Sequence, residues 1–406
     1  MKKLHIARES LFATIFTIVI TFTVSFIPFK FEFSKGIRQE FLGFDIYDLY
    51  YSDRHLGNTT KDSNIVLIQI GDDRATIASQ IRRIKVYSPA VIGVDAVFAK
   101  KADQQEYTMP AKEDSILKEA IGQPGNIVFA SRLDIDTATG KALFIRNFFE
   151  NGDHFPSGYI NFVGNRYSVI RNYPPFYKTG DSINMAFTSA VIKQFSPGKY
   201  NILQQREKNL EVINYTRNLE HYITISKEQL PDYDSTGQLA ELLHGKIVLL
   251  GYFVKKPPLV MDDIYFSPLN GQVAGKSYPD MYGVVIHANI LSMVLAGNYA
   301  SQAPEWVSYL LASVIIFFFL YYMLSQYSRK EHPSHGRFLL IQFLAIIIML
   351  YVFLGIFSEF KVKVPLLPIM IALVLCVELL GLYKMIAVWL HKRKGFTTVF
   401  NHKQAV

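Results

Sequence analysis

Four long apolar runs divide this chain, one near its start and three near its end. The first runs from Leu11 to Phe29, and the others cover Trp306 to Leu324, Phe338 to Phe357 and Leu366 to Leu390. At 1.5 Å per residue, a helix of about 20 residues crosses a hydrocarbon core of roughly 30 Å. The pattern therefore predicts four transmembrane α-helices, with residues 30–305 as a segment large enough to fold as a domain.

Basic residues flank the apolar runs on one side of the predicted membrane, where positive charge favours the cytoplasm. We therefore expect cytoplasmic tails at residues 1–10 and 391–406, and three spans within residues 306–390. This arrangement predicts a multi-pass protein of a bacterial inner membrane, with residues 30–305 in the periplasm. The basic side chains are Lys2, Lys3, Arg8, Arg329, Lys330, Arg337, Lys392, Arg393, Lys394 and Lys403.

Within residues 30–305, short β-branched stretches alternate with amphipathic patterns. Strands separated by helices of about ten residues need crossover connections, which are typical of a largely parallel or mixed sheet. The pattern predicts an α/β extracytoplasmic domain. The predicted strands are residues 64–70, 90–94, 126–130 and 246–251, and the predicted helices are residues 74–87 and 113–121.

The second half of this segment is less regular. Residues 136–180 read as loop or short hairpin, and residues 183–195 as a helix. Residues 210–215 and 221–225 are expected to form an edge pair of strands. Apolar residues recur at helical spacing over residues 283–296, which predicts a helix with one face on the sheet. We expect this helix to link the domain mechanically to the span at Trp306.

Several stretches resemble one family. The chain is similar to the type-two CHASE domain, a sensory extracellular domain associated with bacterial cyclases and histidine kinases, which implies a sensory role. Members commonly continue into a kinase, cyclase or phosphatase module, whereas only residues 391–406 follow the last predicted span. We therefore expect a separate protein to receive the signal. The matching stretches are residues 68–73, 90–98, 213–215, 245–251, 262–268 and 283–289.

Three carboxylates follow predicted parallel strands. Asp72 and Asp73 come after one strand, and Asp95 comes after the next. Ligands of open α/β sheets bind beyond the carboxyl ends of the strands, so these residues are ligand-binding candidates. Arg132 and Tyr252 follow two further strands and are candidates for the same rim. The alternative is turn and N-cap chemistry for the aspartates and plain surface exposure for the other two.

Other polar residues invite a metal or acid–base interpretation. Asp262, Asp263 and His287 lack the spacing of a metal site, and a hydrogen-bonded core histidine is the simpler interpretation of His287. No nucleotide-binding loop or nucleophile motif occurs, so we expect no enzyme, no metal and no cofactor. Glu378 lies within the last apolar run, where a carboxylate is costly unless it is neutral or faces a partner. We regard His287 and Glu378 as coupling or intramembrane candidates.

The net charge of +8 follows membrane topology. Its excess lies in the flanks of the spans, which argues against nucleic acid as a partner. We therefore expect a membrane sensor or adaptor that contacts lipid, binds a ligand or envelope partner outside, and signals to an unknown protein. Self-association into a homo-oligomer stays open. The alternative function is a non-catalytic structural or docking subunit of a cell-envelope complex.

Overall fold

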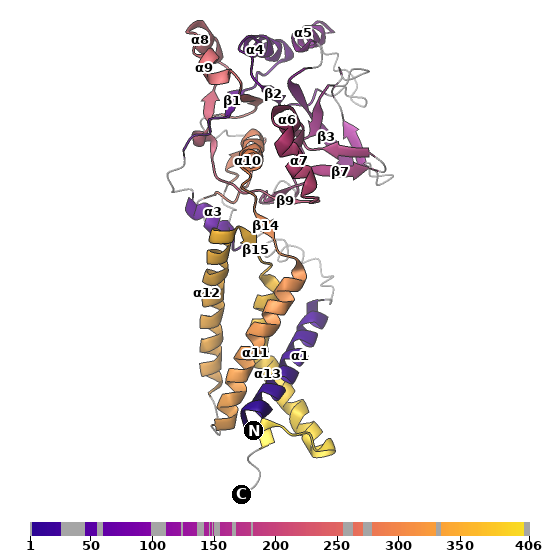
Figure 1. The fold of residues 1–406 in the computed structure, drawn as a ribbon, viewed down its shortest axis with the longest axis vertical. Helices are drawn as coiled ribbons and strands as arrows, with labels where there is room; N and C mark the ends of the chain where they lie inside the picture. The colour runs from indigo at the N-terminus through magenta and orange to yellow at the C-terminus, as the bar shows by residue number, and fades with distance from the viewer. Residues whose placement is uncertain are drawn as a thin grey trace. The chain divides into compact units, whose positions relative to one another are not determined.

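The chain folds into two compact units in a computed structural model (Figure 1). One unit comprises Met1–Leu42 and Ser301–Val406, and the other comprises Gly43–Ala300. The structure describes residues 2–25, 45–54, 60–98, 111–122, 125–135, 142–145, 147, 149, 155–164, 168–179, 182–254, 263–270, 278–329 and 334–401.

A mixed seven-stranded sheet forms the centre of the second unit. Its order is β10-β1-β11-β2-β3-β4, and β5 pairs with β3 beside β4. All its neighbouring strands are parallel except β3 and β4. The prediction of a largely parallel or mixed sheet is therefore confirmed. The strands are β1 (Ile65–Gln69), β2 (Val91–Val94), β3 (Ile127–Ile135), β4 (Ala142–Ile145), β5 (Ser157–Tyr159), β10 (Ile223–Ile225) and β11 (Ile247–Gly251).

The pleat of the sheet sorts its side chains onto two helical layers, because successive residues of a strand point to opposite faces. Ile68, Val94 and Leu250 belong to one core cluster with residues of α4, α5, α8 and α9. On the other face, Gly93 lies against Phe187 and Gly251 against Val284. Figure 1 shows these two layers. They are α4 (Arg74–Val86), α5 (Ala111–Ile121), α8 (Leu230–Ser235) and α9 (Leu239–Leu243), opposite α6 (Phe187–Phe195) and α10 (Gly283–Ala296).

Two predictions for the irregular half are wrong. Helix α6 starts at Phe187 rather than residue 183, because β8 (Ser182–Met185) pairs with β7 (Phe176–Thr179) as an antiparallel hairpin. The expected edge pair also does not form: β9 (Glu211–Val212) pairs with β6 (Asn172–Tyr173), whereas β10 joins β1. Periodicity identifies a strand but not its partner. The remaining elements are α3 (Asp48–Arg54), α7 (Pro197–Gln205), η1 (Leu219–His221), β12 (Ile264–Tyr265) and β13 (Met281–Tyr282).

In the part of the first unit that the structure describes, four α-helices are each long and apolar enough to cross a membrane. Helix α13 packs against the other three, and α1 also packs against α11. Two short strands, β14 and β15, pair in parallel. The buried carboxylate of Glu9 accepts hydrogen bonds from Thr398 and from the Val399 N–H. These elements are α1 (Lys2–Ser25), α11 (Glu305–Arg329), α12 (His335–Phe360), α13 (Leu367–Lys394), β14 (Ser301–Gln302), β15 (Val362–Lys363) and η2 (Val399–Asn401).

Candidate functional site around helix α10

Helix α10 is the helix that the sequence predicted over residues 283–296, and it has these bounds in the structure. The sequence predicted that one face of this helix packs on the sheet, whereas the structure buries every residue from Gly283 to Val294. An apolar helix enclosed on every side must pair each polar side chain inside the protein. Three polar residues interrupt it, namely His287, Asn289 and Ser292, and all three are buried.

His287 faces the end of strand β2. Its Nε2 lies 3.9 Å from Oδ1 of Asp95, and both side chains are almost fully buried, with 5% and 6% exposed. The imidazole ring packs against Phe162 and Phe187, with ring centroids 4.8 and 5.3 Å apart. Its Nδ1 has no hydrogen-bond partner among the described residues. The ring therefore has an unused polar atom beside a buried carboxylate.

A second carboxylate, Asp263, reaches the same place from the start of β12. Asp263 adopts a left-handed backbone with φ 58°, and its carbonyl accepts the Gly283 N–H at 3.2 Å. A side chain at residue 283 would place its Cβ 3.0 Å from Asp263 Oδ1, so glycine lets this carboxylate approach the first turn of α10. The Tyr265 hydroxyl hydrogen-bonds the Asp263 carboxylate. The positive end of the helix dipole adds a favourable interaction.

The surroundings of these groups oppose charge on them. Burial raises the pKa of Asp95 well above its usual range, and the nearby Asp263 carboxylate adds to this effect. Protein atoms around its carboxylate raise the pKa of Asp263 to about 6, although part of the residue reaches solvent. Burial also lowers the pKa of His287 to about 3, so the ring stays neutral at pH 7. The cluster therefore combines a buried acid, Asp95, with a more exposed acid, Asp263, and a neutral histidine.

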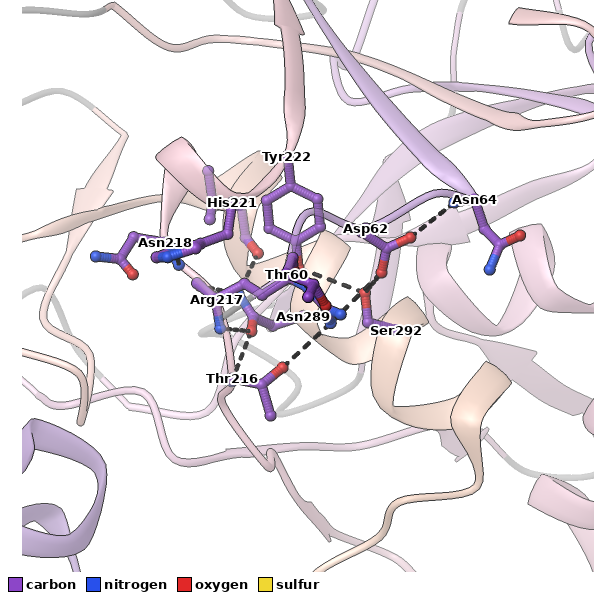
Figure 2. A network of polar contacts seen from close by, with 11 residues as sticks. Thr60, Asp62, Asn64, Thr216, Arg217, Asn218, His221, Tyr222, Asn289 and Ser292 are labelled. Atoms are coloured by element: carbon purple, nitrogen blue, oxygen red, sulfur yellow. Dashed lines mark hydrogen bonds and ion pairs between the residues drawn. The ribbon is translucent and has the colours of Figure 1, made fainter. Parts of the chain in front are cut away.

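Figure 2 shows a polar network that includes the other two polar side chains of α10. Asn289 Oδ1 accepts the backbone N–H groups of Thr216 and Arg217, each at 3.1 Å. Its Nδ2 donates to the Arg217 carbonyl at 2.8 Å and to the Val285 carbonyl at 3.0 Å. One buried amide therefore satisfies four backbone groups and fixes the segment before η1 on the helix.

Ser292 extends this network to the segment before β1. Its hydroxyl donates to Asp62 Oδ2 at 2.6 Å, and Arg217 lies 3.5 Å from the same oxygen. Asp62 Oδ1 accepts the Asn64 N–H at 2.9 Å. The hydroxyl of the fully buried Tyr222 lies 3.4 Å from Ser292. Polar contacts thus join helix α10 to two earlier segments of the chain, one before β1 and one before η1.

A cavity of about 500 Å³ lies next to the network. This volume falls within the usual range for small-ligand pockets. Asn218 belongs to the network, where its backbone N–H contacts His221, and it also lines the cavity. Val285 contributes from α10, so an occupant would touch the helix directly. The other described lining residues are Leu219, Glu220, Thr224, Val254, Ile264, Pro279, Asp280, Met281 and Tyr282.

The structure separates the three aspartates that were expected to share a crevice. Asp73 is the N-cap of α4 and accepts the Thr76 N–H at 2.7 Å, which lowers the pKa of its carboxyl. Asp72 is exposed and forms an ion pair with Lys227. Both belong to the turn into α4, whereas Asp95 lies against α10 on the opposite face. No hydrogen bond or ion pair within the described ranges joins Asp95 to Asp72 or Asp73.

Arg132 and Tyr252 also lie apart. Arg132 is exposed on β3 and pairs with Asp134 at 2.9 Å. Tyr252 comes directly after β11, just as Asp95 comes directly after β2. The ring of Tyr252 lies 5.9 Å from the ring of Tyr282, which lines the cavity. Tyr252 is therefore close to the candidate site, and Arg132 has its own exposed ion pair.

In the helical unit, Glu378 lies 3.4 Å from the His335 side chain. His335 is the first residue of α12, so the carboxylate is level with the beginning of that helix. Both side chains are more than half exposed in the protein. His335 is therefore a polar neighbour of Glu378.

Sequence reasoning missed most of the site. Tyr265, Asn289 and the Asp62–Arg217 pair were not candidates, although polar residues at 289 and 292 on an apolar helix are a detectable signal. Asp262 lies outside the described residues. Within the part of the chain that the structure describes, no group of three His, Cys, Asp or Glu side chains is arranged to hold a metal.

Four apolar helices of spanning length, joined to one α/β domain, define a multi-pass membrane protein. A comparison with protein-family models matches the CHASE2 domain over residues 20–324, well over half of the chain. The protein therefore belongs to the CHASE2 family, whose domains are sensory and extracellular. Comparisons with curated proteins and with solved structures gave no match.

Proposed function

We propose that this protein is a bacterial membrane sensor or adaptor without catalytic activity of its own. Its CHASE2 domain binds a ligand or an envelope partner, and its helices pass the change to a separate membrane or cytoplasmic protein. The observation that carries the proposal is the family match over residues 20–324. The domain faces the periplasm, both termini face the cytoplasm, and the spans contact the lipid of the inner membrane.

Helix α10 is the element that joins recognition to output in this proposal. It carries His287 beside the buried Asp95 side chain, Val285 at the cavity, and Asn289 and Ser292 in the polar network. A ligand that reorganises any of these contacts acts on a single helix. Because packed interiors change between discrete arrangements, a small change at the site can shift the helix as a whole.

Four residues, Gly297 to Ala300, follow α10 before the helical unit begins at Ser301. Helix α10 ends at Ala296, its C-cap Gly297 has a left-handed backbone, and Ala300 bridges to Val212 of the domain. The next residue, Ser301, begins β14, which pairs with β15 between α12 and α13. The expected linker of residues 297–304 is thus occupied by ordered contacts, which supports mechanical coupling.

An insertion tests this coupling. The tagged protein is purified in mild detergent and its partner is identified by mass spectrometry. We then expect Asp95→Ala to change the partner's output in the uninterrupted chain. The same substitution should have no effect when about ten Gly/Ser residues separate Ala300 from Ser301, because a flexible coil transmits no torque.

The control carries the same insertion after Gly237, which has a left-handed backbone and no atom near its missing side chain. This chain should respond to Asp95→Ala like the wild type. If the effect of Asp95→Ala survives the insertion before Ser301, coupling through α10 is wrong.

A docking subunit of a cell-envelope complex is the second candidate function. Large apolar side chains exposed around the β7–β8 hairpin favour it, among them Tyr177, Ile183 and Leu210. In that case the domain would hold a partner without relaying a change.

A further inference from the structure

The β7–β8 hairpin has an open edge. The Ala186 N–H donates to the Pro175 carbonyl, and with the register of the hairpin this makes 177 with 184 and 179 with 182 the hydrogen-bonded pairs. The alternation of antiparallel pairing turns the N–H and C=O groups of Phe176 and Lys178 away from β8. Within the described residues, β7 pairs with β8 alone. Its outer edge can therefore accept another strand.

A groove of about 800 Å³ accompanies this edge. It is lined by β7, by Ile183 of β8, and by the segment between α7 and β9. Ile183 is 60% exposed and Leu210 is 49% exposed, which is high for such large apolar side chains. The described lining residues are Val163, Pro174, Phe176, Tyr177, Lys178, Ile183, Gln204, Glu207, Lys208, Asn209 and Leu210.

The charge around the groove is positive. Lys178 and Lys208 line it without an ion pair to any described residue, and Glu207 is the acidic residue of the described lining. Lys193 lies over the ring of Tyr200, which in turn packs on Phe176. Nearby Arg206 is already neutralised by Glu211 at 2.5 Å. An occupant with carboxylates would find unpaired cations beside an apolar surface.

We infer that this groove docks an extended acidic segment of a partner protein, which adds as a strand to β7. Main-chain hydrogen bonds to Phe176 and Lys178 would hold the strand, alternate apolar side chains would enter the groove, and carboxylates would meet Lys178 and Lys208. A second copy of this chain fits less well. A second copy paired along β7 would offer Lys178 no carboxylate, because the strand Phe176–Thr179 contains no acidic residue.

This inference concerns the partner in the proposed function and does not depend on α10. Its test measures binding itself, so a failure of signalling through α10 would leave the result unaffected. The full chain in detergent is titrated with a six-residue peptide that alternates valine and glutamate, and with its valine–lysine counterpart. Saturation-transfer NMR reports the dissociation constants.

We expect the acidic peptide to bind and the basic one to bind at least about tenfold more weakly, because complementary charge sets specificity. Combined Lys178→Glu and Lys208→Glu should reverse this preference. Lys118→Glu, on the exposed surface of α5, is the matched control and should change neither affinity. Equal binding of both peptides, or no binding of the acidic one, overturns the inference.

Two substitutions at one position test strand addition. Lys178→Gln removes the charge and should weaken binding of the acidic peptide about two- to fivefold. Lys178→Pro also removes the outward N–H without breaking a hydrogen bond of the hairpin. The affinity for the acidic peptide should therefore fall by a further factor of about two to ten. Equal affinities of these two variants would show that no strand adds to β7.

Size-exclusion chromatography with light scattering tests whether a second copy of this chain occupies the groove instead. The wild-type oligomeric state should be unchanged in Lys178→Pro. A dimer that this substitution dissociates would make a second copy the occupant and overturn the inference of an acidic partner segment.

Discussion

Asp95 shows how one buried carboxyl links this domain to pH. Its pKa in the folded protein is raised well above the unfolded value because the site is desolvated and Asp263 is near. The folded state therefore holds a proton that the unfolded state loses above about pH 4. The free energy of unfolding must fall as pH rises from about 4 toward the raised pKa.

We expect Asp95→Asn to remove much of this decline. At pH 5 the melting temperatures of variant and wild type should be close. At pH 8 the variant should melt at a higher temperature than the wild type, since it never has to bury a charge. Thermal unfolding of the detergent-solubilised protein, followed by near-ultraviolet circular dichroism from pH 5 to 8, measures the difference. Asp72→Asn is the control, because that side chain is exposed. Parallel pH profiles for wild type and Asp95→Asn would contradict the assignment.

Local sequence reasoning succeeded where a residue's role is local. Asp73 caps α4, as the turn chemistry of aspartate suggested. It failed for Asp95, whose partner His287 comes from a helix nearly two hundred residues later in the chain. The distance in sequence is the reason, because no short pattern records which face of a sheet a later helix will cover.

At the scale of elements, the close packing of α10 on β11 depends on Gly251. A Cβ at this position would lie 2.6 Å from the Cβ of Val284, which is too close for either backbone to remain in place. Gly251→Ala should therefore displace the first turn of α10 and lower the free energy of unfolding by about 1–3 kcal/mol. The same displacement should disturb the Asp95–His287 contact one turn further along.

Gly198→Ala is the matched comparison, since nothing lies within 4 Å of the added Cβ and residue 198 is helical. Alanine there should be neutral or stabilise by up to about 1 kcal/mol. Hydrogen exchange at α10 and thermal melting distinguish the two variants. Unchanged exchange in Gly251→Ala would mean that the helix tolerates a wider spacing from the sheet.

Elements with strong periodic patterns were predicted well, and elements defined by pairing were not. Helices α4, α5 and α10 and strands β1, β2 and β11 lie within a few residues of their predicted bounds. The β7–β8 hairpin and the β6–β9 pair were missed, because short strands of mixed polarity gain their hydrogen bonds only from partners. The sequence of residues 183–195 contains both a strand and a helix, and only the pairing with β7 divides them.

At the scale of the whole molecule, the four-span arrangement makes a direct prediction. In a Cys376→Ser background, Ser301→Cys should react with a membrane-impermeant maleimide from the periplasmic side, and Ser328→Cys only after the inner membrane is opened. The basic residues beside α11 and α13 provide the reason, because positive flanks stay in the cytoplasm. Labelling of both cysteines from one side would contradict the four-span topology.

The long apolar helices, the α/β class of the domain and the family resemblance were all predictable from the sequence, because hydrophobic periodicity and strand–helix alternation are local properties. Which polar residues meet depends instead on how the elements pack. Asp95 lies against α10, on the face of the sheet opposite α4, which Asp73 caps. On the enclosed helix α10, Asn289 and Ser292 hydrogen-bond inside the domain, and His287 lies beside Asp95. Burial then raises the pKa of Asp95 and lowers that of His287, and this effect depends on the complete fold.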